Sequence, residues 1–130
     1  TPLLHYIIPV QADDLKSFAE IWIDPNAEST DARGNLVHDC IHMLMVFDID
    51  GIGRFEAELA AAGKDVMVNL FCPAPYLPAF SAITAPVREQ ISATGYRLLN
   101  LSVDKLEKHR SLMDVFKTLP HKRTGIDVKV

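Results

Sequence analysis

Three apolar stretches separated by very short connections constrain the fold of this chain most. They run from Ile41 to Ile49, from Arg54 to Ala60 and from Val66 to Phe71, and the second alternates between apolar and charged residues. Such a period of two is typical of strands with one buried face. Gly51 and Gly63 lie in the connections, as turns require. Because a parallel crossover needs a dozen or more residues, the three stretches are predicted to form an antiparallel meander.

Two further strands are predicted before the meander. The first, Ile7 to Val10, is a short apolar run broken by Pro9, which is typical of an edge strand because proline donates no ladder hydrogen bond. The second, Phe18 to Asp24, alternates in part and is expected to end at Pro25. The polar segment 26–35 shows no periodicity, so it is predicted to be an exposed and mobile loop.

One apolar helical stripe follows the meander. It spans residues 75–94, stops at Gly95, and consists of Leu77, Phe80, Ile83, Val87 and Ile91. Pro86 lies inside the stripe, so we expect either a kink or a helix that begins near this proline. The remaining predicted elements are a strand, a shorter helix and a last short strand, over residues 99–103, 104–117 and 126–130.

These elements predict a single α+β domain over residues 1–130. An antiparallel sheet, with a mixed sheet as the alternative, is expected to pack against one main helix and a shorter C-terminal helix. The chain has 130 residues, of which 48% are apolar, and this is enough for one core. Its net charge of −4 forms no single-sign field, which disfavours binding to nucleic acid or to an anionic membrane.

The sequence also bears on cellular location. Its apolar runs are shorter than the ~18 residues of a membrane span, and the N-terminal residues do not follow the pattern of a signal peptide. We therefore expect a cytoplasmic protein without membrane insertion. Cys40 and Cys72 are too few for a disulfide framework and predict a cytosolic thiol pair, with a single disulfide as the alternative.

Asp48 and Asp50 follow an apolar strand in an Asp-x-Asp-Gly pattern. This pattern is similar to the nucleophile loop of haloacid-dehalogenase-type phosphotransferases, where one carboxylate attacks phosphorus, the other acts as acid and base, and Mg²⁺ screens both. Ile52, however, stands where that family has a small hydroxyl residue, and a strand follows instead of a helix. Turn geometry alone also favours acids at a hairpin end. An aspartate phosphatase is therefore the third functional hypothesis, and no catalytic residue is predicted.

His38, Cys40 and His42 alternate along a predicted strand and would share one face. Imidazole and thiolate ligands suit zinc. Side chains two positions apart on a strand stand about 7 Å apart, however, which is too far for adjacent ligation without bending. A strand that enters the core from a polar loop is the preferred interpretation, so neither a metal site nor a cofactor is predicted.

Three segments follow the pattern of one known family. Asp48 to Leu59 is similar to its Leu-Gly-x-Val-x-Val-x-Leu strand, with Ile52 in place of the leucine, and Lys64 to Leu70 is similar to its next strand. Ala85 to Val103 is similar to its closing Leu-Arg-x-x-Leu-x-x-x-Gly pattern and final strand. Residues 49–103 therefore resemble the C-terminal domain of flagellar hook-length control proteins.

This resemblance implies a domain that is not an enzyme. Its expected partner is the cytoplasmic domain of the export-gate switch protein, and its expected role is to switch flagellar type III export from hook-type to filament-type substrates. The protein is then expected in the cytoplasm, with export through the flagellar apparatus as the alternative. A non-enzymatic adaptor domain of similar fold outside the flagellar system is the second functional hypothesis.

Surface positions within the matched stretch are the candidates for partner binding. They lie on the expected wet strand face, on the helix and after its glycine stop: Arg54, Glu56, Glu58, Arg88 and Tyr96. The apolar positions expected to form the core of the switch domain are Ile52, Phe55, Ala57, Val87 and Ile91.

Overall fold

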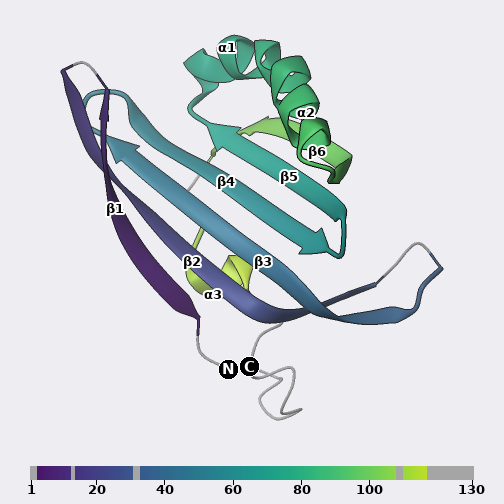
Figure 1. Cartoon of the computed structure of the whole chain (residues 1–130). Helices are drawn as coiled ribbons and strands as arrows, with labels where there is room; N and C mark the ends of the chain where they lie inside the picture. Colours follow the sequence, from purple (N-terminus) through teal and green to yellow (C-terminus); the bar gives the residue numbers. More distant parts are fainter. Residues whose placement is uncertain (1–2, 13, 31–32, 108–109, 117–130) are drawn as a thin grey trace.

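Six strands form one sheet in a computed structural model that describes residues 3–12, 14–30, 33–107 and 110–116 (Figure 1). The strands lie in chain order, and their bounds are β1 Leu4–Ala12, β2 Leu15–Thr30, β3 Leu36–Ile49, β4 Gly53–Ala62, β5 Asp65–Cys72 and β6 Arg97–Lys105. All neighbours pair antiparallel except β5 and β6, which pair parallel. The architecture is strand-dominated α+β, and of the two predicted sheet types the mixed sheet is the one observed.

The predicted meander corresponds to β3, β4 and β5. Met43 pairs with Leu59 and Leu59 pairs with Val68, so apolar positions of the three strands share one face. Gly53 begins β4 with a φ of 128°, and a Cβ atom there would lie 3.0 Å from a side-chain carbon of Pro73. Only glycine fits this close approach without strain.

The parallel pairing of β5 and β6 requires a crossover, which consists of helical segments. A 3₁₀ turn, Ala74–Tyr76, leads into α1 (Leu77–Ala82), and α2 (Thr84–Ala93) follows after a break at Ile83. Pro86 falls in the first turn of α2, where its missing N–H costs no helical hydrogen bond. The predicted interruption of the helix near this proline is therefore confirmed, and the main helix is two short ones.

The strands β2 and β3 are longer than predicted. Pro25 does not end β2, because the pairing with β3 shifts register between Asp24 and Ala27 and so forms an irregularity that accommodates the proline. Within it, the backbone N–H of Asn26 donates a hydrogen bond of 3.1 Å to the carboxylate of Asp24. The prediction of a loop over residues 26–35 is wrong for residues 26–30, which belong to β2, whereas residues 33–35 are exposed and lie outside the strands.

The C-terminal region also differs from the prediction. The predicted helix over residues 104–117 is wrong at its start, because β6 continues to Lys105, which pairs with Cys72. The short helix α3 spans only Leu112–Val115, and a reciprocal capping box between Ser111 and Asp114 fixes its start. The predicted strand over 126–130 lies outside the described residues.

Helices lie on both faces of the sheet, and these faces are named here by what covers them. On the helical face, Ile91 of α2 packs against a buried cluster of Val66, Val68 and Leu98. On the C-terminal face, Val115 and Phe116 pack against a buried cluster with Leu44 and Val46. Figure 1 shows α1 and α2 over the β5 and β6 end of the sheet, with α3 behind β2 and β3. Among the described residues, no helix is long and apolar enough to cross a membrane.

Candidate interaction surfaces

Three predicted partner-binding residues on β4 belong to an ion-pair network. Arg54 Nε lies 2.8 Å from Glu56 Oε2, and Arg110 Nη2 lies 2.6 Å from Glu56 Oε1. Arg110 Nη1 also lies 3.0 Å from Glu58 Oε1. The prediction of a wet strand face is wrong for Glu56, which is only 2% exposed. The reason is Arg110, which is 54 positions later in the chain and joins both glutamates.

The network also joins the sheet to the C-terminal segment. His42 Nε2 lies 2.7 Å from Glu58 Oε2, and the His42 ring lies 4.6 Å from the ring of Phe116. The Arg110 guanidinium lies 4.2 Å from the centre of the Phe71 ring, a cation–π distance. Described residues 110–116 thus pack onto the C-terminal face through both charge and apolar contacts.

The charges in this network stabilise one another. Burial raises the pKa of Glu58, but hydrogen bonds from His42 and Arg110 and their positive charges outweigh burial, so its pKa lies below the ordinary value. For Arg110, burial lowers the pKa, and the two glutamates reverse that effect and raise it. Both groups therefore keep their charge around neutral pH.

A pH dependence of stability follows from Glu58. Its folded pKa lies below the reference value of 4.5, so its contribution to stability is present above that pH and is lost as the pH falls through the folded pKa. We expect the free energy of unfolding, measured with urea at pH values from neutral downward, to decline as the pH falls below 4.5. A Glu58→Gln variant should decline less steeply, and equal slopes in the two proteins would contradict this assignment.

Arg88 and Tyr96, the other two predicted partner-binding residues, lie elsewhere. Arg88 is exposed on α2, which packs on the helical face. Tyr96 is exposed beside the turn between α2 and β6, and Lys64 Nζ lies 4.8 Å from the centre of its ring. The five candidates therefore come from opposite sides of the sheet and do not form one continuous surface.

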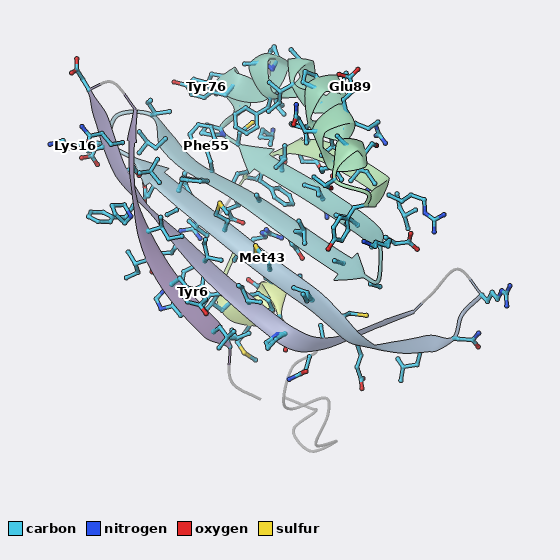
Figure 2. The ribbon with its side chains drawn as sticks, viewed as in Figure 1. Tyr6, Lys16, Met43, Phe55, Tyr76 and Glu89 are labelled. Carbon is cyan, nitrogen blue, oxygen red and sulfur yellow. The ribbon has the colours of Figure 1, made fainter. Side chains whose placement is uncertain are left out.

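The five predicted core positions differ in burial. Phe55 is buried, and the centroid of its ring lies 5.6 Å from that of Tyr76, which is labelled with it in Figure 2. The ring centroid of Phe80 lies 5.4 Å from that of Phe55. Ile91 packs against the cluster on the helical face. It is half-buried, as are the other three: Ile52, Ala57 and Val87.

The aspartates of the phosphatase hypothesis lie at an exposed hairpin end. Asp48 is near the end of β3, opposite Arg54 in the backbone pairing of β3 with β4. Asp50 is in the turn that leads to β4. The strand therefore leads into another antiparallel strand, whereas the phosphatase loop leads into a helix. Among the described residues, no group of three or more histidine, cysteine or acidic side chains could hold a metal ion.

The zinc candidates on β3 have other surroundings. His42 is paired with Glu58, and Cys40 is buried and is not part of a disulfide. His38 lies in β3, but its side chain is outside the description. Cys72 is also buried and outside any disulfide, and burial raises the pKa of its thiol. Of the two predicted cysteine states, the structure therefore shows two thiols and not a disulfide.

The helices α1 and α2 lie over β5 and β6 and leave the helical face without a helix over β1, β2 and β3 (Figure 1), although Ala19 and Ile21 there are buried. We name this region the open face, and it consists of Leu4, Tyr6, Ile8, Val10, Ala19, Ile21, Ile23, Ile41, Met43, Met45 and Phe47. The register places these side chains on one side: Tyr6 pairs with Ile21, which pairs with Met45. None of them is charged. Five are large and exposed, namely Leu4, Tyr6, Ile8, Val10 and Ile41; Tyr6 and Met43 are labelled in Figure 2.

Comparison with protein-family models, curated proteins and solved structures finds no significant match to this chain. Residues 49–103 therefore carry the family resemblance through their sequence pattern alone.

Proposed function

We propose that this chain is a non-catalytic protein-interaction domain. The observation that carries the proposal is the row of exposed apolar side chains on the open face along β1, Leu4, Tyr6, Ile8 and Val10, because exposed apolar patches mark interaction sites. Apolar, charge-poor patches are typical of the centres of protein interfaces. Covering such a surface with a partner removes it from water, which is the main favourable term in association.

Within that class, we propose export-specificity switching in flagellar hook-length control. The support is the resemblance of residues 49–103 together with the order of β4, β5, the helical crossover and β6. The partner would be the cytoplasmic domain of the export-gate switch protein. An adaptor domain outside the flagellar system is the alternative, and it shares the same open face. Asp48→Asn would separate both from an aspartate phosphatase, whose Mg²⁺-dependent activity it would abolish.

The open face can be tested by placing one charge on it. Ile8 is 44% exposed on an edge strand, so Ile8→Lys should preserve folding. Capture of the protein by the immobilised cytoplasmic domain of the export-gate switch protein should fall about tenfold or more, because the interface would bury an unpaired ammonium group.

The matched control is Glu89→Gln, a charge change on the exposed side of α2. It should leave capture unchanged, and urea unfolding should verify that both variants fold. Equal capture of Ile8→Lys and the unchanged protein would contradict a role of the open face in binding this partner.

A further inference from the structure

A second surface lies on the C-terminal face, near the turn that joins β1 to β2. It is an open groove of about 770 Å³, and its apolar wall includes Ile7, Pro9 and Phe18. Phe18 is 63% exposed and Ile7 is 59% exposed, so both leave large apolar surface in water. The register pairs Pro9 with Phe18, which places their side chains together on one side of the sheet.

The rim of the groove is acidic. Glu20, Asp48 and Asp50 contribute three carboxylates, whereas Lys16 contributes the only amino group. Glu20 lies 3.1 Å from His5, but among the described residues no ion pair engages Asp48 or Asp50. Both aspartates are exposed, so they are available to a cation from outside the chain. The Asp-x-Asp pair that suggested a phosphatase thus becomes part of a negatively charged border around an apolar patch.

We propose that this groove binds a segment of a partner protein that presents an apolar side chain flanked by lysine or arginine residues. The apolar side chain would cover Phe18 and Ile7, and the flanking cations would lie near Asp48 and Asp50. Complementary charge is the reason for choosing this occupant, because it favours encounter and suppresses acidic competitors. The proposal rests on the proposed function as an interaction domain, and it names the chemistry of one bound segment.

The test uses labelled synthetic peptides and fluorescence polarisation with the whole chain. In the main peptide, lysine residues alternate with three apolar residues, namely leucine, phenylalanine and leucine. A second peptide has glutamate in place of each lysine, and a third has glycine in place of each apolar residue. Only the first is expected to bind, and added salt should weaken its binding. Asp48→Asn should weaken it about threefold, and Phe18→Ser about tenfold.

Glu89→Gln is the control that distinguishes binding in the groove from non-specific attraction of a basic peptide to an acidic protein. It removes one exposed carboxylate on α2. It should leave the affinity for the lysine peptide unchanged. Equal binding of the lysine and glutamate peptides, or equal effects of Asp48→Asn and Glu89→Gln, would overturn the proposal. Loss of the groove interaction with intact capture through the open face would leave the proposed function standing.

Discussion

Replacing Arg110 by methionine is expected to lower the free energy of unfolding by about 3 kcal/mol. Arg110 binds Glu56, whose side chain is fully inaccessible to solvent, and it also binds Glu58. Removing the guanidinium would leave Glu56 with Arg54 as its remaining ion-pair partner among the described residues. This places the expected loss at the lower end of the range for broken buried pairs. Urea unfolding followed by circular dichroism would measure the difference.

The control for this change is Arg97→Met. Arg97 pairs with Asp65 at 2.6 Å, but its side chain is 72% exposed, so the same substitution should cost less than about 1 kcal/mol. A double-mutant cycle of Arg110→Met with Glu56→Gln should show a coupling of at least about 1 kcal/mol. Similar losses for Arg110→Met and Arg97→Met would contradict the buried network.

Phe116→Ala is expected to cost about 3–5 kcal/mol, an effect as large as that of the arginine or larger. Phe116 is 1% exposed and packs against Leu44 and Val46 on the C-terminal face. Its removal would leave a cavity in that cluster and would also end the ring contact with His42. The same unfolding measurement applies.

Met113→Ala is the matched control on the same short segment. Met113 is 59% exposed, so its truncation should change the free energy of unfolding by no more than about 0.5 kcal/mol. If Phe116→Ala were as mild as Met113→Ala, residues 110–116 would not be packed on the sheet in solution. Together the two pairs of variants test whether this segment is an integral layer of the fold.

Local patterns predicted the part of the fold that local forces determine. The alternation of Phe55, Ala57 and Leu59 against charged neighbours predicted β4, because the period of two depends only on adjacent residues. Pro86 predicted the interruption of the helix for the same reason. The end of β2 was wrongly predicted at Pro25. The strand continues past this proline because its pairing with β3 is irregular there, and this pairing is not a local property of the sequence.

The ion-pair network could not be predicted from sequence. Alternation correctly placed Glu56 and Glu58 on one face of β4, but their burial depends on Arg110, which reaches them from beyond the last strand. The segment from residue 104 onward contains several apolar positions whose spacing predicted a weak helix, but Asp104 and Lys105 extend β6. Non-local pairing decided both outcomes.

The sequence of β1 contains the alternation that forms the open face, but it predicted only a short edge strand. Leu4, Tyr6, Ile8 and Val10 alternate with period two, but Ile7 and Pro9 between them made the stretch look like a short, broken apolar run. In the structure Pro9 faces the opposite side of an edge strand, where its missing N–H is tolerated. An edge strand that is apolar on both sides is unusual for an exposed position, and it is consistent with the two surfaces proposed for partners.

Hook length in cells that carry this chain tests the central functional claim most directly. The segment encoding residues 1–130 would be deleted in frame, and the hooks measured by electron microscopy, with the unchanged segment and the Ile8→Lys variant restored separately. Greatly overlong hooks without filaments are predicted for the deletion and for Ile8→Lys, with normal hooks after restoration of the unchanged segment. Hooks of normal length with normal filaments in the deletion strain would contradict a role in export switching.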